Sequence, residues 1–168
     1  MIFEIKKFAF LYGDSEYFLW FKSDPKNKNE ENFKKVIKWK GLHRGGPPRV
    51  ERLWHNWQNN TIDFYPPVTR AFLNHLRKPI EWPILDKNVF NAKKELPMGR
   101  KYKTNNTICK WEKDYENGYK KFFNKFYAEN EKQIDSMDLP DIDGIDREII
   151  KRRVLDRALW EFGRVEKD

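Results

Sequence analysis

Apolar residues recur along most of this chain with the spacing of one helix face, at positions i, i+3, i+4 and i+7. In the stretch PPVTRAFLNHL, a stripe of four apolar residues also carries a histidine: Val68, Ala71, Phe72, His75 and Leu76. Pro66 and Pro67 suit the start of a helix, because the first turn has no intrahelical acceptor for its N–H groups. The pattern therefore predicts a helix over residues 66–77.

Four further stretches show the same periodicity and predict helices. They are NEENFKKVIKW, RVERLWHNW, WEKDYENGYKKFFNKFY and DREIIKRRVLDRALWEFG, at residues 29–39, 49–57, 111–127 and 146–163. Asp143, Asp146 and Glu148 suit the N-terminus of the last helix, and Gly163 is expected to end it. Strand-like alternation competes with a helix only at residues 3–11. The chain is therefore expected to be all-α.

Loops are predicted where Pro, Gly, Asn and Asp gather along the chain. These loops cover residues 23–29, 41–48, 95–106 and 135–144. None of them has the composition of an interdomain linker, and a length of 168 residues matches the usual size of one domain. Residues 1–168 are therefore expected to form a single domain.

The charge distribution adds a candidate partner. The formal net charge is +8, but 36% of the residues are charged, so most charges serve to solvate the surface. Between residues 87 and 125, eleven Lys and Arg stand against four Asp and Glu. This concentration favours a polyanion such as DNA as a partner, whereas a solvated basic surface is the simpler interpretation.

Several other classes of site and location are excluded or disfavoured. Cys109 is the single cysteine, so an internal disulfide and a multi-cysteine zinc or iron–sulfur site are excluded. His43, His55 and His75 lack metal-site spacing, and no metal or cofactor is expected. No apolar run approaches the roughly 18 residues of a membrane span. We expect a cytoplasmic monomer that does not enter a membrane.

One carboxylate stands in unusually apolar surroundings. In EWPILDKNVFNA, Asp86 follows Trp82, Ile84 and Leu85 and precedes a second apolar pair. An aspartate at this place is typical of a helix N-cap, whose carboxylate accepts N–H groups two or three residues further on. An acid or base in a reaction is the alternative interpretation, and one residue can serve in both roles.

The stretch WPILDKNVFNA resembles a segment of the helix-hairpin-helix DNA glycosylase superfamily, especially the adenine glycosylases of the MutY type. In that family a Pro-Ile-Leu-Asp-x-Asn-Val run delivers the catalytic aspartate, and Asp86 takes that place. The resemblance implies a two-lobed helical bundle with Asp86 in the cleft. There the aspartate would stabilise a sugar cation or activate the attacking species after the base has been flipped out.

Two weaker similarities accompany this segment, together with three departures. PPVTRAFLNHL resembles the second helix of the family's hairpin, and VLDRALWEFGR resembles a late helix. However, NNTIDFYPPVT lacks the glycines of the phosphate-binding turn. Val68 or Thr69 takes the place of the Schiff-base lysine of bifunctional members. The family's frequent four-cysteine iron–sulfur loop is absent, because Cys109 is the single cysteine. The resemblance therefore implies a reduced, monofunctional relative that uses Asp86 and a water.

Candidate binding residues follow from the same resemblance and from composition. Aromatic residues for a base pocket are Trp54, Trp57 and Trp82. The loop HRGGPPR has the composition of a phosphate-contacting loop or of a plain turn between helices. The stretch KKELPMGRKYKTNN combines cations with Tyr102, as in a nucleic-acid-binding loop or a solvated basic loop. The candidate nucleic-acid contacts are Arg44, Arg49, Lys87, Arg100, Lys101 and Lys103.

Three hypotheses about function remain open at this point. The first is a DNA-glycosylase-like protein that binds DNA and hydrolyses an N-glycosidic bond through Asp86. The second is a non-catalytic relative that keeps the helical core and binds nucleic acid or protein. The third is an unrelated helical interaction protein with a coincidental match at Asp86.

Overall fold

The computed structural model describes Ile5, residues 14–96, Gly99 and residues 115–165. Within these residues the regular structure is helical throughout, with no strand. The all-α prediction is therefore confirmed for the described part of the chain. Residues 3–11, where a strand competed with a helix, lie outside that part except for Ile5, and so does most of the predicted loop at residues 95–106.

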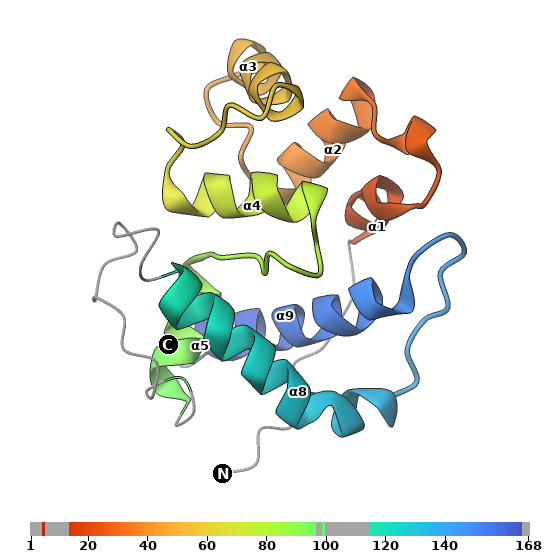
Figure 1. Cartoon of the computed structure of the whole chain (residues 1–168), viewed down its shortest axis with the longest axis vertical. Helices are drawn as coiled ribbons and strands as arrows, with labels where there is room; N and C mark the ends of the chain where they lie inside the picture. The colour runs from red at the N-terminus through yellow and green to blue at the C-terminus, as the bar shows by residue number, and fades with distance from the viewer. Residues whose placement is uncertain (1–4, 6–13, 97–98, 100–114, 166–168) are drawn as a thin grey trace.

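The helices form two groups, drawn one above the other in Figure 1. The N-terminal helix group contains α1 (Ser15–Phe21), the short 3-10 helix η2 (Pro25–Asn27), α2 (Glu30–Lys40), α3 (Pro47–Gln58) and α4 (Pro67–Arg77). The C-terminal helix group contains α5 (Lys87–Glu95), the π-helix η3 (Tyr115–Lys120), α8 (Lys121–Asp135) and α9 (Arg147–Val165). The segment 78–86 crosses from one group to the other.

Local sequence signals explain where several helices begin and end. The Asn29 side chain caps α2 by accepting the N–H of Asn32, and Gly41 ends it in the left-handed conformation with a φ of 81°. Helix α4 begins at Pro67, as the proline pair predicts. The helices predicted at residues 29–39, 49–57 and 66–77 are thus confirmed as α2, α3 and α4.

The end of the last helix differs from the prediction. Gly163 does not terminate α9, which continues to Val165. A Cβ atom at Gly163 would lie 1.8 Å from the Asn88 carbonyl oxygen and 2.9 Å from the Ala92 nitrogen. The glycine is therefore explained by close packing of α9 on α5 rather than by a helix stop. This contact fixes the helix that begins directly after Asp86.

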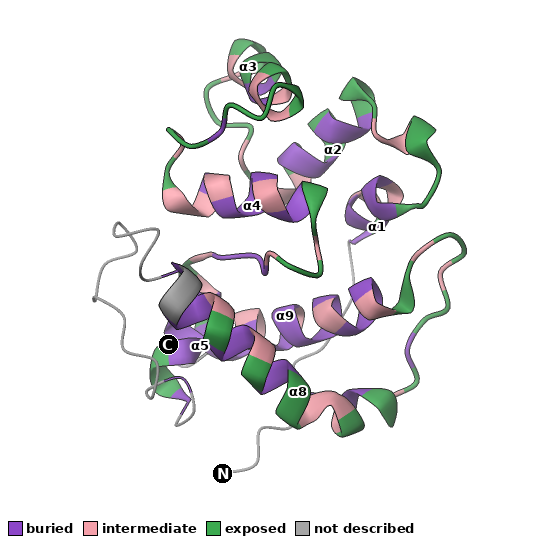
Figure 2. Ribbon diagram, viewed as in Figure 1, coloured by how far each residue is buried: buried purple, intermediate pink, exposed green. Residues whose placement is uncertain are grey.

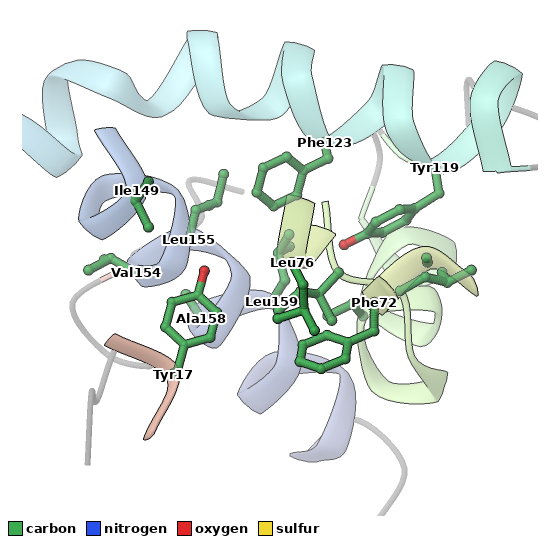
Figure 3. Close-up of a cluster of buried hydrophobic side chains, with 14 of the residues drawn as sticks. Tyr17, Phe72, Leu76, Tyr119, Phe123, Ile149, Val154, Leu155, Ala158 and Leu159 are labelled. Atoms are coloured by element: carbon green, nitrogen blue, oxygen red, sulfur yellow. The ribbon is translucent and has the colours of Figure 1, made fainter. Parts of the chain in front are cut away.

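One hydrophobic cluster joins the two helix groups. Figure 2 shows buried residues on the faces that the helices turn toward each other. In Figure 3, Tyr17, Phe72 and Leu76 from the N-terminal helix group meet Phe123 and Leu159 from the C-terminal helix group. The two groups thus share a core, and the segment 78–86 is held between them.

Candidate functional site

Asp86 occupies the N-cap of α5. Its Oδ1 accepts the backbone N–H of Asn88 at 2.8 Å and that of Val89 at 3.1 Å. These are the groups two and three residues further on, so the predicted cap is observed. The cap uses Oδ1 alone, which leaves Oδ2 for another interaction.

Lys40 takes the second oxygen of this carboxylate. Its Nζ lies 3.1 Å from Asp86 Oδ2, and the two side chains are only 11% and 18% exposed. Lys40 is the last residue of α2, so this ion pair bridges the two helix groups. A mostly buried pair of this kind fixes the position of the carboxylate more firmly than a surface pair does.

The segment leading to Asp86 is anchored from both sides. His75 on α4 donates from Nδ1 to the Trp82 carbonyl oxygen at 2.6 Å, and Tyr115 donates to the Pro83 carbonyl oxygen at 2.6 Å. The Nε2 atom of His75 accepts from the Tyr17 hydroxyl at 2.8 Å. Burial lowers the pKa of His75 to about 3, so the imidazole is neutral at pH 7 and suits both hydrogen bonds. Asp86 therefore follows a backbone with little freedom to shift.

A cavity of about 210 Å³ adjoins the carboxylate. We call it the Asp86 cavity, and its wall contains three carboxylates, three cations, two indoles and one aliphatic side chain. These residues are Asp14, Asp86, Asp156, Lys40, Arg153, Arg157, Trp39, Trp160 and Ile84. They come from the N-terminal helix group, the crossing segment and α9, so the cavity lies where these three parts meet.

Arg153 organises the charged wall of the cavity. Its guanidinium contacts both carboxylate oxygens of Asp14, at 3.1 and 3.3 Å, and also pairs with Asp156. The Arg153 and Asp14 side chains are 6% and 3% exposed. Charges buried this deeply need partners, and Arg153 supplies them for two carboxylates at once. Asp14 precedes α1, so this pair also joins the two helix groups.

Asp156 is the least satisfied carboxylate of the wall. Its Oδ2 pairs with Arg153, whereas its Oδ1 is buried without a hydrogen-bond partner among the described residues. Burial raises the pKa of Asp156 to about 6, Arg153 opposes the rise, and the nearby charge of Asp86 adds to it. The neighbouring Arg157 places one nitrogen 2.7 Å from Glu161, but its Nε is likewise buried without a partner among these residues.

The three tryptophans predicted for a base pocket do not line the Asp86 cavity. Trp54 and Trp57 pack against Phe33 in the N-terminal helix group, with ring centroids 5.1 and 5.7 Å away. Trp82 stacks on Tyr115 at 5.6 Å. Of the tryptophans that the structure describes, Trp39 and Trp160 are the ones in the cavity wall.

The predicted nucleic-acid contacts are only partly described. Arg44 and Lys87 are exposed, and the Arg49 guanidinium donates to the Arg44 carbonyl oxygen at 2.8 Å. Lys87 is the first residue of α5 and directly follows Asp86. The other three predicted contacts lie outside the described residues: Arg100, Lys101 and Lys103.

Sequence reasoning missed most of the charged wall. A signal was present in α9, where Arg153 and Asp156 lie three residues apart among the apolar positions of the helix. Opposite charges on the buried face of a helix indicate a paired site in the interior. Lys40 gave no such signal, because it ends a helix that is rich in lysine.

The described part of the chain contains no cluster of three or more His, Cys, Asp or Glu side chains that could hold a metal ion. No described helix is both long and apolar enough to span a membrane. Comparisons of the chain with protein-family models, with curated proteins and with solved structures found no match.

Proposed function

We propose that this protein is a DNA-glycosylase-like hydrolase that cleaves an N-glycosidic bond at the Asp86 cavity. The observation that carries the proposal is the double position of Asp86, whose carboxylate caps α5 and also forms part of the cavity wall. A carboxylate held this way combines a fixed position with access to a bound molecule. The two helix groups would then correspond to the two lobes of the helix-hairpin-helix glycosylase fold.

The reaction needs a negative charge beside the sugar. As the bond between C1′ and the base nitrogen breaks, positive charge develops on the sugar ring and the base departs with the bonding electrons. Water then adds its oxygen to C1′ and gives up a proton to a nearby proton acceptor. An anionic Asp86 would stabilise the sugar cation and accept that proton. Because Oδ1 is committed to the cap, Oδ2 is the oxygen assigned to this role.

The sugar cation would compete with Lys40 for Asp86 Oδ2. Its Nζ holds Oδ2 at 3.1 Å, whereas Lys78 pairs with Glu81 on the surface and Lys87 is exposed. We expect no imine between Lys40 and an abasic sugar, because an ammonium paired with a carboxylate is not a nucleophile. Borohydride trapping on abasic duplex tests this expectation, and a covalent adduct would contradict the monofunctional assignment.

Single-turnover base release from a panel of duplexes with damaged or mismatched bases tests the proposed reaction. Wild-type protein should release at least one base, and Asp86→Asn should reduce the rate about 100-fold or more. Asp146→Asn is the matched control, because Asp146 accepts the backbone N–H of Glu148 at 2.9 Å but does not line the cavity. Equal rates for the wild type and Asp86→Asn would refute the site.

A second candidate function is nucleic-acid binding without cleavage. The observation that favours it is the balance of charge in the cavity wall, where Lys40 already neutralises Asp86 and Arg153 neutralises Asp14. In that case no duplex of the panel loses a base. Asp86→Asn would then leave DNA affinity unchanged or strengthen it, because a like charge is removed from the neighbourhood of the phosphates.

A further inference from the structure

Two neighbouring residues of α9 that line the Asp86 cavity each have a buried polar atom without a hydrogen bond. Among the described residues, no partner is found for a buried oxygen of Asp156 or for the buried Nε–H group of Arg157. A buried polar atom without a hydrogen bond costs about 1–3 kcal/mol relative to a satisfied one. The other carboxylates of the wall differ in this respect, since both oxygens of Asp14 and both oxygens of Asp86 have partners.

The two atoms have complementary chemistry. The Asp156 carboxylate oxygen is an acceptor, and the Arg157 Nε–H group is a donor. A molecule that satisfies both must present a donor and an acceptor side by side, as the amide or amidine edge of a nucleobase does. Both residues line the cavity, but the two atoms themselves are shielded in the structure, so binding requires each side chain to turn toward the cavity.

The rest of the wall fits a flat heterocycle. Trp39 and Trp160 supply indole rings, and aromatic rings stack on nucleobases of every kind. The Arg157 guanidinium lies 4.7 Å from the centre of the Trp160 ring, so the donor and one indole are held together. Glu161 fixes the opposite end of that guanidinium at 2.7 Å, which orients Arg157 from outside the cavity.

We propose that the Asp86 cavity binds the hydrogen-bonding edge of a nucleobase, with Asp156 accepting from a base N–H group and Arg157 Nε donating to the adjacent ring nitrogen or carbonyl oxygen. The inference rests on the proposed function for its substrate class, and it adds the two residues that distinguish one base from another. Asp156 and Arg157 are specificity residues in this scheme, and Asp86 remains the group beside the sugar.

Calorimetric titration with free 2′-deoxynucleosides tests this inference without any cleavage. The protein is Asp86→Asn, so that no substrate turns over, and the probes are the four common 2′-deoxynucleosides. At least one should bind. Its edge-blocked analogue should bind about tenfold more weakly, because one hydrogen bond is absent and its partner stays unsatisfied. The analogues are purine 2′-deoxyriboside for deoxyadenosine and the N-methylated forms for the other three.

Two substitutions assign the contact to α9. On the Asp86→Asn background, Arg157→Lys keeps the charge but removes Nε, and Asp156→Asn keeps the shape but removes the carboxylate. Each should weaken binding about tenfold and reduce the difference between a nucleoside and its blocked analogue. Asp146→Asn is the control, because Asp146 does not line the cavity, and it should change affinity by less than about threefold. Melting curves establish that each variant is folded.

The outcomes separate this inference from the proposed reaction. Binding with edge discrimination but no base release supports the inference and refutes catalysis. Base release by the wild type with no nucleoside binding at millimolar concentration overturns the inference and leaves catalysis standing. The inference is also overturned if blocked and unblocked nucleosides bind equally, or if both α9 variants keep the affinity unchanged. A water would then satisfy the Asp156 oxygen and the Arg157 Nε–H group.

Discussion

Two buried polar clusters lie next to each other in this protein, and they are satisfied to different degrees. In the His75 cluster, which comprises His75, the Tyr17 hydroxyl and the Trp82 carbonyl, both imidazole nitrogens are hydrogen-bonded. The space beside it is only about 10 Å³, at the lower limit for one water. The Asp86 cavity offers about 210 Å³ and leaves atoms of Asp156 and Arg157 without partners among the described residues.

The difference separates a polar cluster that holds the fold from one that can hold a ligand. A satisfied cluster with room for at most one water beside it contributes to stability and cannot admit a larger molecule. Unsatisfied atoms on residues that line an open cavity can gain hydrogen bonds when a molecule binds and the side chains turn toward it. Substitutions in the His75 cluster should therefore act mainly on stability, and those in the Asp86 cavity mainly on binding or catalysis.

The largest effect on stability is expected for His75→Ala. This change removes a buried ring and leaves the Tyr17 hydroxyl and the Trp82 carbonyl without their partner, so the free energy of unfolding should fall by about 2–4 kcal/mol. Urea unfolding measures it. His55→Ala serves as control, because His55 is exposed and its replacement should change stability by less than about 0.5 kcal/mol. Similar decreases for both variants would contradict a structural role for the His75 cluster.

Acid should destabilise the protein through the same residue. The pKa of His75 is about 3 in the folded protein and about 6.5 in an unfolded chain, so the unfolded state takes up the proton first. The stability that neutral His75 provides is present above pH 6.5 and disappears as pH falls toward 3. Between pH 7 and pH 5 the decrease is about 2 kcal/mol. Urea unfolding at each pH measures this decrease in the free energy of unfolding, and the His75→Gln variant should not show it.

A smaller effect on stability is expected for Asp156→Asn. The amide oxygen can still accept from Arg153, and Arg153 keeps Asp14 as its partner. Burial already disfavours the charge of Asp156, whose pKa is raised to about 6. The free energy of unfolding at pH 7 should therefore change by less than about 1 kcal/mol. A decrease as large as that of His75→Ala would place Asp156 among the residues that hold the fold.

Replacing the predicted nucleic-acid contacts should affect DNA affinity. Replacing Arg100, Lys101 and Lys103 together by Ala should weaken duplex binding and lower the slope of log affinity against log salt by about 0.9 for each phosphate that is no longer neutralised. Fluorescence titration of a labelled duplex at several salt concentrations measures both. Replacing Arg44 and Arg49 in the same way tests the second predicted binding region. Binding that ignores salt between about 50 and 200 mM would exclude phosphate neutralisation.

The sequence predicted local features better than the site. The cap at Asp86 and the start of α4 at Pro67 follow from a few adjacent residues, and both are observed. The predicted end of α9 was wrong, because the packing of Gly163 on α5 depends on residues far away in the chain. The family resemblance and the DNA partner stay predictions.

The composition of the cavity wall also lay beyond the reach of local patterns. Lys40 and Asp86 meet across 46 positions, and Arg153 meets Asp14 across 139. Such pairs follow from tertiary structure rather than from the spacing of neighbouring residues. Trp54 and Trp57 were assigned to a base pocket from the family resemblance and residue type, and both rings pack against Phe33 in the N-terminal helix group.

The most direct test of the account measures the stability and the single-turnover rate of Asp86→Asn together. The amide oxygen can still accept the N–H groups of Asn88 and Val89, but Lys40 loses its carboxylate partner, so the free energy of unfolding should fall by about 1–3 kcal/mol while the variant stays folded. Base release should fall about 100-fold or more, because the negative charge is gone. A variant that is less stable but releases base at the wild-type rate would show that Asp86 is a helix cap and nothing more.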